Sequence, residues 1–176
     1  IRFLWKYPEL LHTQLDALIQ LSFNHNLHIL VPMVTLPRDM RAVKEALREA
    51  AARVRTSDLP KLGAMIETPA AALAAPEMLK HADFLSFGTN DLTQYLFAAD
   101  RENTAVDSYF DDTHDIIFRL ISMVHGNVPD AHLSVCGELA GRTEATSRLV
   151  ECGITSLSVV PLSIPAVKEA VRNCGR

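Results

Sequence analysis

The 176-residue sequence has few of the features that mark membrane, secreted or nucleic-acid-binding proteins. It contains no run of 18 apolar residues and no long apolar stretch behind the positive charge near its start, so we expect neither a membrane span nor a signal peptide. Its three cysteines, an odd number without C-x-x-C spacing, argue against a disulfide framework and a zinc site. A net charge of −4 without a basic stripe argues against nucleic acid as a partner. We therefore expect a cytoplasmic globular protein.

Several common catalytic motifs are also missing. There is no Gly-rich phosphate loop of the Walker or dinucleotide type, no H-E-x-x-H and no G-x-S-x-G. The seven histidines show no spacing typical of a metal site. Because the chain also lacks internal repeats and Gly/Ser-rich linkers, we expect residues 1–176 to form a single domain.

What the sequence does contain is an alternation of short apolar runs with helical patterns, which is typical of an α/β protein with a parallel sheet. The predicted strands are 27–33, 62–66, 84–87, 133–136 and 157–160, and their nearly unbroken apolar character favours strands covered on both faces. The predicted helices are 8–23, 37–54, 113–125 and 163–172, with a further helical stretch over 69–80 interrupted at Pro76. Five such units suit either a small doubly wound sheet or part of an eight-stranded barrel, since a whole barrel needs roughly 200 residues or more.

Two polar segments follow predicted strands directly. Glu67 comes just after strand 62–66 and precedes a short Ala-rich helix, and Gly88-Thr89-Asn90-Asp91 follows strand 84–87 and opens another helix. In α/β folds this edge of the sheet faces the ligand crevice. Glu67 and Asp91 should be neighbours there, where two carboxylates suit Mg²⁺ and a helix amino terminus favours an anion. Alternatively, Glu67 is solvated or caps the next helix, and Asn90 or Asp91 is a helix N-cap.

Two further side chains carry possible chemistry. Arg101 can clamp a phosphate or carboxylate, or form a plain ion pair with a neighbour such as Asp100. Cys136 ends strand 133–136 and is followed by glycine. Three roles are possible for this residue: an inert core thiol, a nucleophilic thiolate, or a protonated thiol that acts as a general acid toward carbon.

Four segments together resemble the phosphoenolpyruvate-utilising enzymes, in order and spacing as well as in residue type. They are Gly63-Ala64-Met65-Ile66-Glu67-Thr68-Pro69-Ala70-Ala71, Phe87-Gly88-Thr89-Asn90-Asp91-Leu92-Thr93-Gln94-Tyr95, Ala99-Asp100-Arg101-Glu102-Asn103 and Cys136-Gly137-Glu138-Leu139-Ala140-Gly141. Within this superfamily the resemblance is greatest to the enzyme I type of the sugar phosphotransferase system, and it runs across essentially the whole chain.

The resemblance implies a phosphoenolpyruvate-binding (β/α)8 TIM-type barrel, of which this chain would be a carboxy-terminal part with about five βα units. It implies Glu67 and Asp91 as Mg²⁺ ligands, and Cys136 as the acid that protonates the enolate. Arg2, Asn90, Asp91 and Arg101 are then the implied substrate contacts. The implied partners are a phospho-histidine domain of the parent protein, through it a histidine phosphocarrier protein, and a second copy of the chain in a homodimer.

Two residues depart from the family pattern. His28 begins a strand where an arginine is expected, and a neutral imidazole would supply less charge to a phosphate. Arg142 replaces an acidic residue after Gly141. Two other functions stay open: the barrel of a pyruvate phosphate dikinase or phosphoenolpyruvate synthase, and a catalytically degenerate phosphoenolpyruvate-sensing regulator, for which His28 is the only support.

Overall fold

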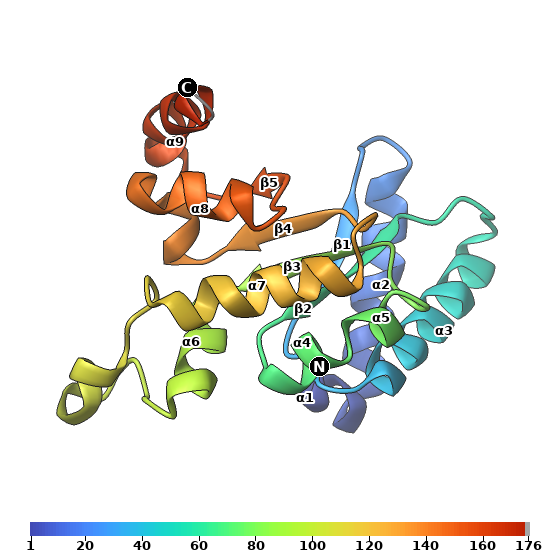
Figure 1. Cartoon of the computed structure of the whole chain (residues 1–176). Helices are drawn as coiled ribbons and strands as arrows, with labels where there is room; N and C mark the ends of the chain where they lie inside the picture. Colours follow the sequence, from blue (N-terminus) through green and yellow to red (C-terminus); the bar gives the residue numbers. More distant parts are fainter. Residues whose placement is uncertain (175–176) are drawn as a thin grey trace.

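The computed structural model describes residues 1–174 and has α/β architecture (Figure 1). Its strands are β1 (His28–Val31), β2 (Lys61–Ile66), β3 (Phe84–Gly88), β4 (Leu133–Cys136) and β5 (Ser156–Leu157). All neighbouring pairs are parallel, and the order across the sheet, β1-β2-β3-β4-β5, is the order along the chain. A doubly wound sheet reverses its strand order at a switch point, whereas a barrel adds strands sequentially. The sheet is therefore part of a (β/α)8-type barrel, as the resemblance implied.

Two helices, α1 (Arg2–Lys6) and α2 (Pro8–Ser22), precede β1, and at least one helix follows each of the five strands. The later helices are α3 (Pro37–Val54), α4 (Pro69–Leu73), α5 (Ala75–Met78), α6 (Thr89–Phe97), α7 (Asp115–Asn127), α8 (Thr146–Glu151) and α9 (Ile164–Asn173), with short 3₁₀ turns at Thr104–Tyr109, Glu138–Gly141, Thr143–Ala145 and Pro161–Ser163. Figure 1 shows α7 lying along the sheet, α2 and α3 beside each other, and α8 and α9 beyond β5. Within residues 1–174, no helix is both long and apolar enough to cross a bilayer.

The long helices confirm the sequence predictions to within about two residues, and three details were wrong. The stretch 69–80 breaks at Ala74 instead of Pro76, because proline is accommodated in the first turn of α5. The predicted strand 157–160 shortens to the two residues of β5 before the turn Pro161–Ser163. Helices α1 and α8 were not predicted, since each spans only five or six residues and shows little periodicity.

Burial of the sheet differs between its two faces. On one face the strand side chains are fully buried against the helices, among them Leu62, Leu85 and Val135. On the other face, which corresponds to a barrel interior, Met65, Ser134 and Cys136 are only partly buried. The expectation that both faces are covered was wrong, because small and polar residues alternate with the apolar ones. This second face leads to the polar edge where the strands end.

Candidate functional site

The acidic pair predicted at the carboxyl edge of the sheet is present. Ile66 at the end of β2 is paired in register with Phe87 of β3, so the segments that leave the two strands run side by side. Glu67 follows β2 directly, and Asp91 lies in the first turn of α6, where its carboxyl is within hydrogen-bonding reach of that of Glu67. Neither alternative reading applies: Glu67 is only 5% exposed, and the hydroxyl of Thr68 caps α4 by accepting the Ala71 N–H at 3.2 Å.

Glu67 is a buried carboxyl whose charge is only partly compensated. Its Oε1 accepts the backbone N–H of Met33 at 2.7 Å, from the loop after β1. Burial raises the pKa of Glu67, the Met33 N–H opposes that rise, and the neighbouring Asp91 raises the pKa further. Met33 supplies this N–H from a left-handed backbone conformation (φ 52°), which is uncommon for a residue other than glycine. The site therefore uses an unusual backbone conformation to hold a carboxyl group.

Gly88 is needed because it leaves room for a neighbouring side chain, and its backbone conformation does not require glycine. Its φ of −88° is open to any residue, but a Cβ atom there would lie 2.6 Å from Cγ of Glu67. The glycine therefore leaves room for the Glu67 side chain to lie against the end of β3.

Cys136 ends β4 on the face of the sheet that corresponds to a barrel interior. Its Sγ lies 3.4 Å from the Phe87 carbonyl oxygen, and the Ser86 hydroxyl lies 3.8 Å from the sulfur. Burial raises the pKa of the Cys136 thiol, the Ser86 hydroxyl opposes the rise, and the charge of Glu67 adds to it. The thiol is therefore protonated at neutral pH, which disfavours the nucleophilic thiolate and suits a proton donor.

The turn after Cys136 is held by the start of α6. The hydroxyl of Thr89, which is fully buried, donates to the Cys136 carbonyl oxygen at 3.0 Å. The side-chain oxygen of Asn90 accepts the Glu138 N–H, also at 3.0 Å. Between them Gly137 has φ +91°, where a Cβ atom would meet the Thr89 hydroxyl at 2.6 Å. Asn90 and Asp91 thus lie inside α6, and neither is its N-cap, which is Gly88.

A cavity of about 650 Å³ opens beside this turn. It is lined by Asn90, Cys136, Gly137, Glu138, Gly141, Arg142, Ser158, Val159, Val160 and Ser163. Arg142, which departs from the family pattern, donates from Nε to the buried carboxylate of Asp112 at 3.1 Å. This ion pair neutralises the charge of Asp112 and so allows its carboxylate to be buried. It could not be predicted from the sequence, because the two residues are 30 positions apart.

The two predicted substrate arginines lie at the periphery. Arg2, on α1, donates to the Thr35 hydroxyl at 3.1 Å, and Thr35 lies two residues after Met33. Arg101 lies in an exposed turn past the end of α6, where its backbone N–H donates to the Gln94 side chain at 3.3 Å. Among the described residues, neither an ion pair with Asp100 nor a hydrogen bond to the acidic pair involves Arg101. Arg2 is therefore linked to the site through the β1 loop, whereas Arg101 is not.

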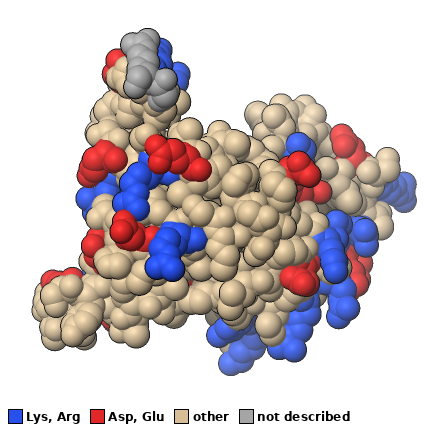
Figure 2. Space-filling view, in the orientation of Figure 1, with Lys and Arg blue, Asp and Glu red and all other residues tan. Residues whose placement is uncertain are grey.

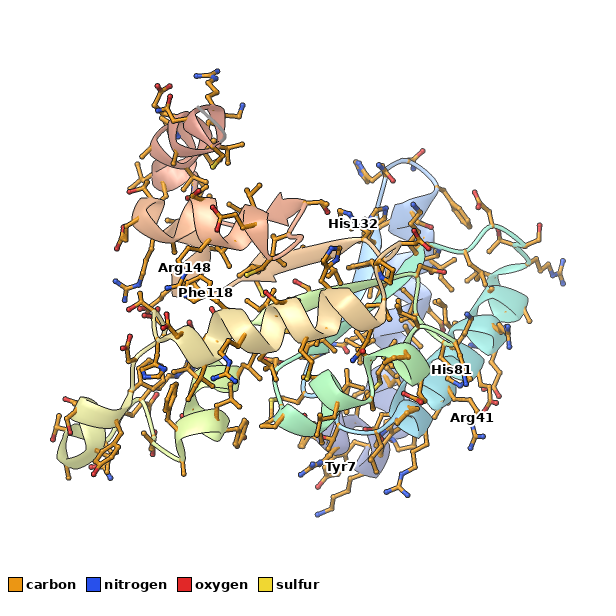
Figure 3. The ribbon with its side chains drawn as sticks, in the orientation of Figure 1. Tyr7, Arg41, His81, Phe118, His132 and Arg148 are labelled. Atoms are coloured by element: carbon orange, nitrogen blue, oxygen red, sulfur yellow. The ribbon has the colours of Figure 1, made fainter. Side chains whose placement is uncertain are left out.

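The expectation that His28 affects phosphate binding was wrong. His28 begins β1 at the amino ends of the strands, opposite the edge that holds Glu67, and is paired in register with Lys61. Its ring packs against Phe84, with centroids 5.6 Å apart, and Phe84 in turn lies 6.4 Å from His132, which Figure 3 shows at the same end of the sheet. The sequence located the strand but not which of its ends faces the site.

The acidic pair fits a hard divalent cation as far as its chemistry is concerned. The two carboxyl groups come from adjacent loops, and one of them is buried with a raised pKa. A bound cation would offset the repulsion between the two negative charges. Mg²⁺ typically takes one or two carboxylates and keeps sites for water and ligand oxygens. In the described part of the chain no group of three His, Cys, Asp or Glu side chains is placed to hold a metal by itself, so the remaining ligands would come from substrate and water.

Fold and site together define an α/β barrel protein with its polar site at the carboxyl ends of the strands. The comparisons with known proteins are more specific: the chain belongs to the family described as PEP-utilising enzyme, PEP-binding domain, whose model matches residues 1–176. PEP stands for phosphoenolpyruvate.

Among curated proteins, the chain is similar to the phosphoenolpyruvate-protein phosphotransferase of Buchnera aphidicola subsp. Acyrthosiphon pisum, with 37% identity over 98% of this chain and 31% of that protein. It is also similar to the multiphosphoryl transfer protein of Xanthomonas campestris pv. campestris, with 40% identity over 97% of this chain and 21% of that protein. The chain thus spans less than a third of the length of these relatives.

A solved structure supports the fold independently. A citrate lyase from Burkholderia xenovorans LB400 superimposes with a TM-score of 0.63 at 16% identity, covering 81% of this chain and 48% of that one. At this identity the likeness concerns the fold alone, and it agrees with a partial barrel.

Proposed function

We propose that this chain is the phosphoenolpyruvate- and Mg²⁺-binding catalytic portion of a phosphoenolpyruvate-protein phosphotransferase. In this function a phosphoryl group passes from phosphoenolpyruvate to a histidine on another domain, and pyruvate is released. The observation that carries the proposal is the convergence of the Glu67–Asp91 pair with a protonated Cys136 thiol at one edge of the sheet. The family and the names of the relatives support the same reaction.

Each site residue has a role that follows from its chemistry. Glu67 and Asp91 would hold Mg²⁺, which when bound supplies positive charge against the substrate's phosphate and carboxylate groups. Asn90 presents a side-chain amide to the cavity and has its oxygen engaged by the Glu138 N–H, so its NH2 group is free to donate to a ligand. Arg2 would bind an anionic group of the substrate as a guanidinium donor, and Arg101, which lies outside the site in this structure, would bind another after its exposed turn approaches the acidic pair.

Cys136 would complete the reaction as a general acid. When the acceptor histidine nitrogen forms its bond to phosphorus, the bond from phosphorus to the enol oxygen breaks and leaves the enolate of pyruvate. The methylene carbon of the enolate takes the proton of the Cys136 thiol and becomes the methyl group of pyruvate, and the thiolate regains a proton from water. A thiol whose pKa is raised by burial holds this proton until carbon accepts it.

The proposed setting follows from the same family. The acceptor would be a phospho-histidine domain of the parent protein, which passes the phosphoryl group to a histidine phosphocarrier protein in sugar transport. We propose a cytoplasmic location, a homodimer and a single domain for residues 1–176. Of the alternatives, the sensing regulator loses its support because His28 lies at the opposite end of the sheet, and the names of the relatives favour a protein acceptor over the dikinase or synthase reaction.

The test is a calorimetric titration of phosphoenolpyruvate, with and without Mg²⁺, into this chain and into a version extended upstream to a complete barrel. Glu67→Ala and Asp91→Ala should each abolish the Mg²⁺-dependent binding, because each removes one of two carboxylates. Cys136→Ala should leave binding intact and block pyruvate release by the full-length parent. Glu77→Ala, at an exposed position on α5, is the matched control and should change nothing.

Retained Mg²⁺ dependence in both carboxylate variants would exclude the metal assignment. Absence of binding to a folded, complete barrel would exclude the proposed substrate. Unchanged pyruvate release by Cys136→Ala would leave the site in place and remove only the thiol from its role.

A further inference from the structure

A groove separate from the acidic pair lies between α1 and the start of α3. Its volume is about 590 Å³, within the range of small-molecule sites. It is lined by Arg2, Trp5, Thr35, Leu36, Arg38, Asp39, Arg41 and Ala42. Figure 2 shows the basic side chains gathered over this end of the molecule, where Figure 1 places α1 and α3, and in Figure 3 Arg41 points away from α3.

The groove is positively charged in a chain that is acidic overall. Residues 1–55 carry eight Lys and Arg against five Asp and Glu, a net charge of +3, whereas residues 56–176 carry nine against sixteen, a net charge of −7. Three guanidinium groups and one carboxylate line the groove itself, leaving about two positive charges. This segregation of charge was not visible in the total of −4 and favours an anion at this end of the molecule.

The charges of the groove are available to a ligand. None of the four ion pairs among the described residues involves Arg38 or Arg41, and both side chains are exposed. The one acidic group, Asp39, is already engaged, because a single carboxylate oxygen accepts the N–H groups of Thr35 at 3.1 Å and Leu36 at 2.9 Å. Guanidinium groups without an acidic partner bind phosphates in bidentate fashion.

The groove also has an aromatic wall. Trp5 on α1 is half-buried, packs partly against the hydrophobic core and lines the groove together with the α3 arginines Arg38 and Arg41. An indole beside several arginines offers a stacking surface for a planar ring together with donors for its phosphates. We propose that this groove is a second anion site, which binds a small organic polyphosphate of the nucleotide type.

The site would be distinct from the proposed phosphoenolpyruvate site. Only Arg2 belongs to both, and it lies between them through its hydrogen bond to Thr35. Arg38 and Arg41 have no part in the acidic pair or in the surroundings of Cys136. A ligand in the groove would therefore reach the substrate site through Arg2 and the β1 loop.

Trp5 provides a direct readout, since it is the only tryptophan in the sequence. ATP, inorganic tripolyphosphate and adenosine should be titrated separately into the chain while its tryptophan fluorescence is recorded. We expect ATP to change the emission, tripolyphosphate to compete with ATP, and adenosine alone to bind far more weakly. Replacing both groove arginines, Arg38→Gln with Arg41→Gln, should weaken ATP binding by about tenfold or more.

The matched control is Arg48→Gln, which removes an exposed arginine of the same helix outside the groove and should leave ATP binding within about twofold. Equal weakening by this control, retained binding in the double variant, or no fluorescence change with ATP would each overturn the proposal. Loss of ATP binding in Glu67→Ala would overturn the proposal as well, because ATP would then bind at the acidic pair and not in the groove. Loss of phosphoenolpyruvate binding with ATP binding retained would count against the proposed function only.

Discussion

At the scale of single residues, the site is built around one carboxyl group that the protein does not fully neutralise. Glu67 has a backbone N–H on one side and another carboxyl on the other, so its ionised form is disfavoured in the folded chain. In the absence of a cation this arrangement costs stability, and a bound cation would offset that cost. The same feature thus links metal binding to folding.

The linkage predicts a pH-dependent gain in stability for Glu67→Gln. Because the folded-state pKa of Glu67 is raised, its contribution to stability is fully present below the unfolded pKa and is lost as pH rises through the folded pKa. The glutamine cannot ionise, keeps an oxygen for the Met33 N–H and can donate to Asp91. Its unfolding midpoint, measured in chelator, should exceed that of the wild type increasingly as the pH rises from about 4 to about 8.

Glu77→Gln serves as the control for this measurement, because it makes the same substitution at an exposed position on α5, outside the site. A difference between Glu67→Gln and the wild type that stays constant over the whole pH range would contradict the argument from burial.

Thr89 is predicted to position Cys136 without touching the substrate. Thr89→Val removes the hydroxyl that donates to the Cys136 carbonyl oxygen and should cost about 1 to 2 kcal/mol of stability. If the thiol moves protons at pyruvate carbon, Mg²⁺-dependent exchange of the pyruvate methyl protons with solvent deuterium, followed by NMR, should slow by about tenfold. Thr89→Ser keeps the donor and should restore the exchange rate; equal rates in the two variants would show that the hydrogen bond has no positioning role.

At the scale of elements, close packing between the ends of β2 and β3 limits which side chains can replace Gly88. Gly88→Ala places a methyl group 2.6 Å from Glu67 Cγ and should destabilise the fold by about 2 to 3 kcal/mol while displacing the carboxyl. Gly126→Ala is the matched comparison, because nothing lies within 4 Å of its added methyl group in α7, and it should stabilise by about 0.5 to 1 kcal/mol. Denaturant unfolding measures the change in the free energy of unfolding, which should fall in Gly88→Ala and rise in Gly126→Ala. An unchanged free energy of unfolding in Gly88→Ala would show that Glu67 can move aside.

The elements also show which parts of the site the sequence could predict. The neighbouring positions of Glu67 and Asp91 followed from two parallel strands that are consecutive in the chain. The N–H group of Met33 could not be predicted, since nothing in its neighbourhood marks a left-handed methionine. The salt bridge of Arg142 with Asp112 links residues from separate βα units. Local patterns therefore identified the acidic chemistry, whereas contacts between loops required the folded chain.

At the scale of the whole molecule, the sheet has two edge strands, and they differ in how many residues pair with the neighbouring strand. β2, β3 and β4 each have a paired strand on both sides, β1 is paired on one side only, and β5 is paired to β4 through two residues. The carboxyl pair is located at the ends of β2 and β3, two of the three internal strands. Its geometry should therefore depend less on the edges than the geometry of β5 and the adjoining cavity does.

This arrangement predicts a gradient of amide hydrogen exchange across the sheet. Exchange should be slowest in β2 and β3, faster in β1 and fastest in β5, because edge strands open without disturbing the central pairs. In the version extended upstream to a complete barrel, protection should rise most in β1 and β5, where new strands pair, and least in β2 and β3. Uniform protection in the chain, or a rise confined to the central strands, would mean that the five strands do not behave as the open sheet described above. The acidic pair would then owe its geometry to the edges as much as to the centre.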